Sequence, residues 1–442
     1  MNRTLGSEDL ELLRKGFSAN PTYRLVQNAI TKVGFDDVAL NREIVNATDH
    51  SLSISLDDWK VTNQEHSGRC WLFAGLNLLR VGAMRKMGLK EFEFSQNFVM
   101  FWDKLERANY FLEAVIETAD RDVDDRTVAF LLDATANDGG QWNMFVSLVN
   151  KHGLVPKAFM PETQSSSNTA RMNSVLRYLL RQGARTLRQA AARSVDEARA
   201  AKADVLAAVH RVLCMHLGSP PEEFEWQWID AERKFHRDGA ITPREFAARY
   251  AELPLDEYVC LVHDPRPTSP MGRTFTVEYL GNVVGASPVT YLNVEMPVMK
   301  ALAARVLESG SPVWFGCDVA KMMSNDHGIW DAALFDLSGV YDTSFHLDKA
   351  ERLVYHETQM THAMLFTGVD LVDGRPRRWR VENSWGKEKG RDGFYTMNDS
   401  WFDEYVFEIA AHRSLLTDEQ REAFEQAPII LPAWDPMGAL AC

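Results

Sequence analysis

The chain has 442 residues, with 48 Lys or Arg against 62 Asp or Glu, so its formal net charge is −14. A chain of this length can bury a large core and normally forms two or three domains, and its negative surface repels nucleic acid. No apolar run approaches the roughly 18 residues that span a bilayer, and residues 1–17 lack the apolar region of a secretory signal. The composition predicts a soluble, cytoplasmic protein for which neither membrane nor nucleic acid is the expected partner.

The five cysteines, at positions 70, 214, 260, 317 and 442, are odd in number and show no paired spacing. They predict no disulfide framework, which fits a reducing compartment. His356 and His362 do not form a metal motif, because two histidines six residues apart on a helix point about 240° from each other. The sequence therefore predicts neither a metal ion nor another cofactor.

The first half of the chain is predicted to be mostly helical. Residues 1–60 form an N-terminal extension with helices near Glu8–Lys15 and Thr22–Val33, and residues 61–165 form a helical unit. Residues 166–255 are rich in Ala, Arg and Leu at helical spacing, which predicts an amphipathic helical insertion used for packing or assembly. Its clearest helical segments are Val175–Leu180, Ala190–Val209 and Pro243–Tyr250.

The second half is predicted to contain most of the strands. Residues 256–310 alternate like strands between Pro- and Gly-rich breaks and return to the core, and residues 311–412 form a strand-rich unit. Residues 413–442 begin with a capping box at Thr417–Gln420, open a short helix and end as an extended arm with three prolines. The predicted fold class is α+β.

Cys70 carries the clearest chemical signal. It follows Ser67-Gly68 and precedes apolar residues at near-helical spacing, so it is predicted at the N-terminus of a buried helix. Free N–H groups and the helix dipole favour a thiolate there. Gln64, six residues upstream, is placed to donate to the same developing oxyanion as the Cys70 N–H. A lone cysteine is more often a small core residue, so this interpretation depends on the other groups.

His362 and Asn383 are predicted to meet through a hairpin. Ala363–Asp370 and Arg378–Asn383 alternate like strands around a two-residue turn at Asp373-Gly374. With that turn, facing positions have numbers that sum to about 747. His362 then faces Trp385, and Asn383 lies two residues away on the same side, within reach of the imidazole.

These residues together resemble the papain superfamily of cysteine peptidases, through Gln-(x5)-Cys-Trp at Gln64–Trp71, a later His362, and Asn-Ser-Trp-Gly at 383–386. Papain-type enzymes carry Cys-Gly-Ser-Cys-Trp, with the histidine roughly 130–150 residues after the nucleophile. Here Ser67 replaces the first cysteine of that motif, and His362 comes 292 residues after Cys70, which predicts a long insertion.

Three further stretches are similar to the bleomycin hydrolase and aminopeptidase C branch of that superfamily: Asp138–Trp142, Met360–Met364 and the tail Leu431–Cys442. The resemblance covers nearly the whole chain. It implies a papain-like two-lobed core with a helical insertion, a C-terminal arm lying in the active-site cleft, and a homo-hexamer whose sites face an internal channel.

The resemblance also assigns roles. The catalytic residues are Cys70 as nucleophile, His362 as base and acid, Asn383 as its orienting partner and Gln64 as oxyanion donor. The residues expected to line the substrate cleft are Gly139, Gly140, Trp385 and Ala441. Relatives can trim their last residue, and loss of Cys442 would leave the Ala441 carboxylate to face the free amine of a peptide.

The predicted function is a cytosolic thiol aminopeptidase that removes N-terminal residues from peptides through a Cys-His-Asn acyl-enzyme mechanism. One alternative is a papain-like endopeptidase with an open cleft, which an N-blocked peptide would distinguish. The other is a non-catalytic peptidase-fold scaffold or nucleic-acid binder. A lost nucleophile or base would be its sign, and the sequence keeps both.

Overall fold

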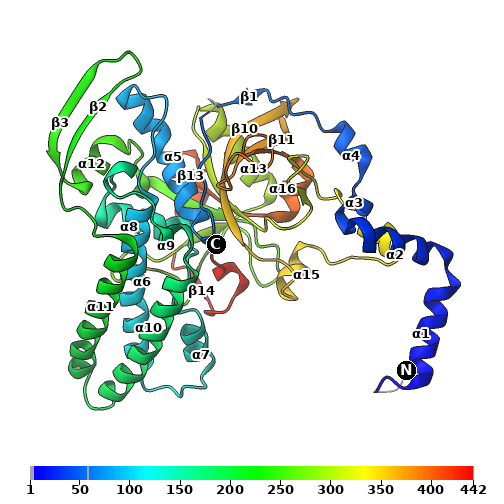
Figure 1. Cartoon of the computed structure of the whole chain (residues 1–442), viewed down its shortest axis with the longest axis horizontal. Helices are drawn as coiled ribbons and strands as arrows, with labels where there is room; N and C mark the ends of the chain where they lie inside the picture. The colour runs from blue at the N-terminus through cyan, green and yellow to red at the C-terminus, as the bar shows by residue number, and fades with distance from the viewer. Residues whose placement is uncertain (1–3, 57–58, 442) are drawn as a thin grey trace.

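The computed structural model describes residues 4–56 and 59–441. A helical lobe and a lobe built on one large sheet lie side by side, and the N-terminal helices project from the sheet lobe (Figure 1). The α+β architecture predicted from the sequence is confirmed. The C-terminal end of the chain lies between the two lobes (Figure 1).

The large sheet has the strand order β14-β5-β6-β4-β13-β7-β10-β11-β12-β9-β8, with β1 paired to β10. Its strands are β1 (Ile54–Ser55), β4 (Tyr258–Val262), β5 (Thr274–Val277), β6 (Tyr291–Asn293), β7 (Val313–Cys317), β8 (Met323–Ser324), β9 (Ile329–Trp330), β10 (His362–Val372), β11 (Arg375–Glu382), β12 (Phe394–Asn398), β13 (Val406–His412) and β14 (Ile429–Leu431). The strands of residues 256–310 are therefore part of this sheet, since β4 pairs with β13.

The helical lobe is built around α5 (Cys70–Met87), which is apolar on all sides and buried along most of its length. It starts at Cys70, as predicted, and ends at Gly88 in the left-handed conformation that closes many helices. The other main helices of the lobe are α6 (Gln96–Glu117), α7 (Arg126–Asp133), α8 (Trp142–His152), α10 (Ala170–Ala191), α11 (Val195–Leu217) and α12 (Pro243–Tyr250).

The insertion differs from its prediction in two ways. The helix expected over Ala190–Val209 is wrong, because α10 stops at Ala191 and α11 restarts at Val195, where the Ser194 side chain caps it by accepting from the Glu197 N–H. The insertion also contains an antiparallel hairpin of β2 (Phe224–Ile229) and β3 (Phe235–Ile241). Its alternating aromatic residues pack against the helical lobe, and the helical composition around them concealed the pattern.

The β10–β11 hairpin has the register that the sequence predicted at both of its ends. Val372 faces Arg375 next to the turn, and Leu365 faces Glu382 at the far end. Two irregularities between these pairs, one on each side of Gly368, shift the register and then restore it. The strand ends that carry His362 and Asn383 therefore meet as expected.

The far face of the sheet is covered by α13 (Met296–Glu308) and α16 (Asp399–Tyr405), which enclose a second core. Stacked and tilted rings fill it, with Phe366 against Phe315 at 3.8 Å and Trp379 against Phe402 at 4.8 Å between ring centroids. The remaining helices and turns are α9 (Gln164–Ser167), α14 (Leu337–Tyr341), α15 (Lys349–Val354), α17 (Asp418–Ala423) and the 3-10 turns Lys157–Phe159, Leu255–Glu257, Arg413–Leu415 and Pro436–Gly438.

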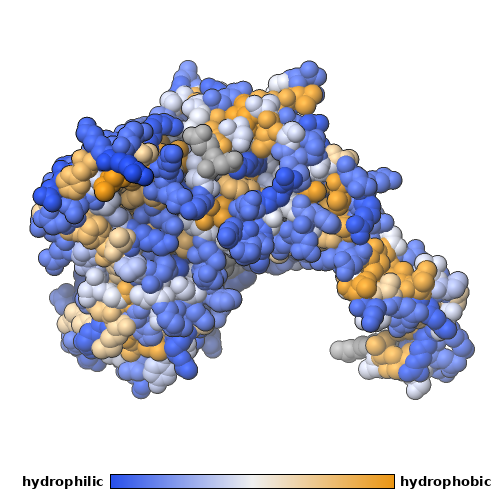
Figure 2. Space-filling view, turned by 45° about the horizontal axis from the view of Figure 1, so that its top comes forward, coloured by the Kyte–Doolittle hydropathy of each residue, from blue (hydrophilic) through white to orange (hydrophobic). Residues whose placement is uncertain are grey.

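The N-terminal extension consists of α1 (Ser7–Ala19), α2 (Pro21–Val33), α3 (Phe35–Ala39) and α4 (Arg42–Ala47). The first two helices match their predictions within a few residues. Neither of them buries a single residue, and together they reach away from the body (Figure 1). Figure 2 shows hydrophobic residues gathered on this projection.

Candidate active site

Cys70 is the first residue of α5 and is completely buried. The backbone N–H of Ala363 donates to its Sγ at 3.4 Å, which places the thiol against the start of β10, directly beside His362. The free N–H groups of the first helical turn surround this position with positive potential. The structure thus brings together two predicted site residues that are far apart in the sequence.

His362 and Asn383 form the predicted contact, with 2.9 Å between Nε2 and Oδ1. The Asn383 oxygen also accepts the Ser384 backbone N–H at 2.7 Å, and since a backbone N–H can only donate, the atom facing His362 is the amide oxygen. Nε2 must then carry a proton, so Nδ1 is the nitrogen able to accept one in the neutral ring. The Trp385 ring lies over the imidazole, 4.9 Å between centroids, and shields this contact.

Gln64 is held beside the same group of residues. Its Oε1 accepts from the Ser384 hydroxyl at 2.7 Å, and its backbone N–H donates to the Ser384 carbonyl at 2.8 Å. The side-chain Nε2 donates to the Ser67 carbonyl at 2.5 Å. An amide nitrogen has two hydrogens, and this bond engages one of them.

Glu382 fixes the strand end that carries Asn383. This fully buried carboxylate accepts hydrogen bonds from Arg80 at 2.8 Å and Asn77 at 2.9 Å, both on α5, and from the Trp59 indole at 2.5 Å. Burial raises the pKa of Glu382, and the Arg80 charge and the hydrogen bonds oppose that shift. The bonds join the helix of Cys70 to the strand that precedes Asn383.

Gly139 and Gly140 lie between the helix of Cys70 and the C-terminal end of the chain. A Cβ built on Gly140 would lie 2.5 Å from the Trp71 ring, so no larger residue fits beside the helix of Cys70. The Gly139 carbonyl accepts from Arg107 at 2.8 Å, which holds the pair in place.

The C-terminal arm (residues 432–441) packs against this glycine pair. Ala441 forms two backbone hydrogen bonds with Gly140, at 3.0 and 3.2 Å, and is fully buried. The arm thus uses the antiparallel pairing by which an extended peptide binds a strand edge. Ala441, the last of the predicted site residues, therefore lies against Gly140, while Cys442 lies outside the described residues.

Several side chains that the sequence did not single out hold the arm. Arg266 makes two hydrogen bonds to Asp435, at 2.8 and 3.0 Å, while also binding Asp264. The Tyr291 hydroxyl donates to the Met437 carbonyl at 2.8 Å, and Arg126 lies 4.0 Å above the Trp434 ring. Arg266 stands in one of the Pro-rich breaks between the predicted strands of residues 256–310, and no local pattern links it to Asp435.

Glu408 lies beneath the arm and is fully buried on β13. A small cavity of about 10 Å³, room for about one water, separates it from Met437 and Met360. Among the residues that the structure describes, none hydrogen-bonds the Glu408 Oε1. Burial raises the pKa of Glu408 to about 7, and a hydrogen bond from Cys260 only partly offsets this.

Across the described residues, no cluster of three or more His, Cys, Asp or Glu side chains is arranged to hold a metal ion. The groups around Cys70 instead provide what thiol chemistry requires: a sulfur at a helix N-terminus, an imidazole with a fixed tautomer, and hydrogen-bond donors nearby. Over residues 4–56 and 59–441, no helix is both long and apolar enough to cross a bilayer.

Comparison with known proteins agrees with a site for thiol chemistry. Residues 4–438 match the peptidase C1-like family. Aminopeptidase C of Listeria innocua is 42% identical over 441 residues, covering 100% of both chains. Bleomycin hydrolase of Gallus gallus is 41% identical over 449 residues, covering 99% of each. The crystal structure of PepW from Lactobacillus rhamnosis superposes with a TM-score of 0.97 at 41% identity, covering 100% of both chains.

The chain therefore belongs to the peptidase C1-like family, and its fold is papain-like. Within that family it is a cysteine-type aminopeptidase, similar over its whole length to aminopeptidase C and bleomycin hydrolase. The resemblance read from its motifs is confirmed.

Glu408 gives the site a predictable response to pH. Its pKa in the folded protein, about 7, lies above the usual value of 4.5. Below pH ~4.5 the carboxyl is neutral in both the folded and the unfolded chain, so its protonation does not affect stability. Between pH ~4.5 and ~7 it ionises more readily in the unfolded chain, which lowers the free energy of unfolding progressively. The gain in free energy of unfolding that Glu408→Gln gives over wild type should therefore be larger at pH 8 than at pH 5, by about 2–3 kcal/mol. Urea unfolding of both proteins at the two pH values measures this difference. Exposed Glu419→Gln is the control, and the same pH response in both variants would contradict the assignment.

Proposed function

We propose that this thiol aminopeptidase removes N-terminal residues from peptides through Cys70, His362 and Asn383, in a cleft whose far side is closed by its own C-terminal arm. The observation that carries the proposal is the pairing of Ala441 with Gly140 in the cleft beside Cys70. An open-cleft endopeptidase would need that strand edge for its substrate.

In the proposed reaction, His362 Nδ1 takes the thiol proton and Cys70 attacks the scissile carbonyl. The carbonyl oxygen becomes an oxyanion and accepts hydrogen bonds from the Cys70 N–H and the Gln64 amide. His362 then protonates the leaving amine as the C–N bond breaks, and water attacks the acyl-enzyme to free the amino acid. Asn383 keeps the imidazole in the tautomer that makes Nδ1 the acceptor.

The arm supplies the selectivity for free amines. Because it uses the backbone of Gly140, a peptide is left with the space between the end of the arm and Cys70. We assign the anchoring carboxylate to Ala441 after removal of Cys442, facing the substrate's amine as an ion pair. A blocked amine would meet both a steric barrier and an unpaired carboxylate.

Self-association is proposed through the N-terminal projection. Leu10, Leu13 and Phe17 lie on one face of α1 at helical spacing and are all exposed. An isolated 13-residue helix is marginally stable in water, so a second copy of this chain is the proposed cover of that face. The family resemblance makes a hexamer the expected assembly, with peptides as substrates.

A cytoplasmic location is proposed on chemical grounds. The cysteines within the described range, Cys70, Cys214, Cys260 and Cys317, carry free thiols. Free thiols persist in a reducing compartment. The net charge of −14 supports peptides rather than nucleic acid as the ligand.

Replacement of the nucleophile tests the chemistry. Cys70→Ser should lower kcat on a fluorogenic aminoacyl amide by more than about 10³-fold, because the imidazole does not deprotonate a serine hydroxyl near neutral pH. Circular dichroism should show an unchanged fold, since the change is nearly isosteric. Cys214→Ser, on the insertion, is the matched control. Activity of Cys70→Ser within tenfold of wild type would remove Cys70 from the mechanism.

Deletion of residues 435–442 tests the arm. Free-amine substrates should lose about one to two orders of magnitude in kcat/KM, since a charge-assisted contact contributes about 1.5–3 kcal/mol. N-acetylated peptides should become substrates, because the groups around Cys70 are untouched. Both activities are measured on the same peptide, with and without the acetyl group.

A milder variant accompanies the deletion. Asp435→Asn weakens the Arg266 contact while keeping the full chain, so it should show the same two changes to a smaller degree. Arg413→Gln breaks an exposed pair with Glu425 ahead of the arm and serves as the control. If the deleted enzyme still refuses acetylated peptides, the arm does not provide the exclusion.

Charge placed on the projection tests the assembly. Leu13→Glu with Phe17→Glu should lower the mass measured by light scattering, because two buried carboxylates would be left unpaired at the interface. Met215→Glu, on the exposed face of α11, is the control. An unchanged mass for the double variant would show that copies do not associate through α1.

A further inference from the structure

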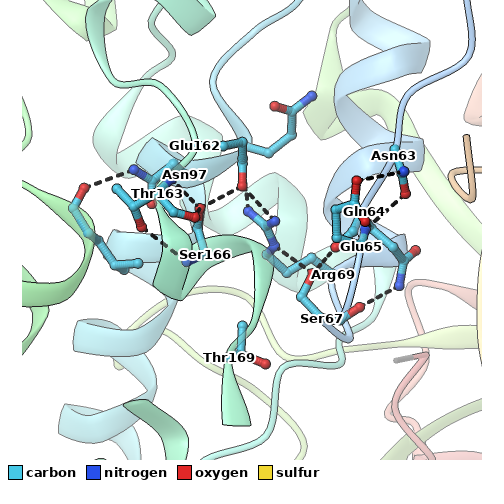
Figure 3. A network of polar contacts seen from close by, with 12 residues as sticks. Asn63, Gln64, Glu65, Ser67, Arg69, Asn97, Glu162, Thr163, Ser166 and Thr169 are labelled. Atoms are coloured by element: carbon cyan, nitrogen blue, oxygen red, sulfur yellow. Dashed lines mark hydrogen bonds and ion pairs between the residues drawn. The ribbon is translucent and has the colours of Figure 1, made fainter. Parts of the chain in front are cut away.

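Arg69 stands directly before Cys70 and is almost completely buried. Its two terminal nitrogens bind the carboxylate of Glu162 in the parallel arrangement that favours arginine, at 3.0 and 2.7 Å. Its Nε donates to the Ser67 hydroxyl at 2.9 Å, which completes the network of Figure 3. One side chain thus joins Glu162 to the turn that precedes the nucleophile.

That turn carries the proposed oxyanion donor. The Ser67 hydroxyl donates to the Gln64 carbonyl at 2.6 Å, and the Gln64 amide returns a bond to the Ser67 carbonyl. The two bonds close a ring between residues 64 and 67, and Arg69 holds it through the Ser67 oxygen (Figure 3). A displacement of Ser67 therefore moves the Gln64 amide.

Glu162 is itself anchored outside the catalytic group. It accepts from the Ser166 hydroxyl at 2.6 Å at the end of α9. Burial alone would raise the pKa of Glu162, but the Arg69 charge and the hydrogen bonds hold it below its usual value. The carboxylate therefore stays charged at neutral pH and keeps the arginine paired.

The helical insertion is connected to this anchor. The Thr163 hydroxyl donates to the His216 carbonyl at 2.9 Å, and the Asn97 amide holds both the Pro161 and Leu217 carbonyls at 2.8 Å. The end of α11 thus fixes the segment that contains Glu162. A continuous set of buried and part-buried polar contacts runs from the insertion to the turn of Gln64.

We propose that Arg69 and Glu162 are positioning residues that hold the Ser67 turn, and through it the Gln64 amide, for stabilising the oxyanion. The pair acts on the geometry of the donor and leaves the Cys70–His362–Asn383 group unchanged. A merely structural pair would affect folding alone. This inference rests on the proposed roles of Gln64 and Cys70, and Cys70→Ser tests the role of the nucleophile separately.

Two substitutions separate these possibilities. Glu162→Gln removes the charge without changing the shape, and Arg69→Met removes the bridge to Ser67. In both, kcat should fall about 10- to 100-fold, part of the loss expected for one oxyanion donor, while KM stays within about threefold. Affinity for an aminoacyl aldehyde, whose adduct places an oxyanion in the same position, should fall by a similar factor.

Two further measurements complete the test. If the pair were purely structural, neither of them would change differently from kcat. Alkylation of Cys70 by iodoacetamide needs the thiolate but no oxyanion donor, so its rate and pH profile should stay at wild-type values. The double variant Arg69→Met with Glu162→Gln leaves no unpaired charge and should recover thermal stability without recovering kcat. Lys300→Met and Asp399→Asn break a comparable, partly buried pair on the far face of the sheet and should leave kcat and aldehyde affinity unchanged.

The results discriminate clearly. Recovery of kcat together with stability in the double variant would make the pair structural only. A loss of alkylation rate equal to the loss of kcat would place its effect on the nucleophile. Either outcome overturns the inference, whereas a selective loss of kcat and aldehyde affinity supports it.

Discussion

The active site depends on one buried seam, where α5 meets the ends of β10 and β11. The thiol of Cys70 comes from the helix and the imidazole of His362 from the sheet, and the seam holds them together. Glu382 is its centre, since it binds Asn77 and Arg80 of α5 while standing next to Asn383 in the chain. A buried carboxylate is unfavourable unless it is paired and hydrogen-bonded, so its partners are tightly constrained.

The same seam determines what the cleft can admit. Trp71 follows Cys70, and its ring requires a glycine at position 140, whose backbone forms an antiparallel bridge with Ala441. The arm is held in this pairing at Asp435 by a partly buried arginine, Arg266, and at Met437 by a tyrosine hydroxyl. The selectivity proposed for the enzyme thus comes from occupying part of a general peptide-binding groove.

Around the nucleophile, hydrogen bonds and charge pairs take the place of covalent links. Ser67 stands where the papain motif has a cysteine, and its hydroxyl connects Gln64 with Arg69. Glu162 and Asp138 then attach this loop to the helical lobe, through Arg69 and the Gly68 N–H respectively. Such a network tolerates a reducing compartment, because none of its links is a disulfide.

The sequence by itself determined the elements whose signals are local. The helix that starts at Cys70, the hairpin that brings His362 to Asn383, and the cap at Thr417 follow from apolar period, turn residues and capping residues close together in the chain. The sequence also indicated the four catalytic candidates, since their motifs are compact, and their roles stay predictions. The β2–β3 hairpin has local aromatic alternation too, but the helical composition on both sides of it concealed the pattern.

Only the tertiary structure decided which distant charges meet. Arg69 with Glu162 and Arg266 with Asp435 are 93 and 169 residues apart, and a single arginine in a sequence does not indicate its partner. These pairs form because folding places both members in surroundings poor in water, where each charge needs the other. Their positions depend on the arrangement of the lobes, which no local pattern of residues encodes.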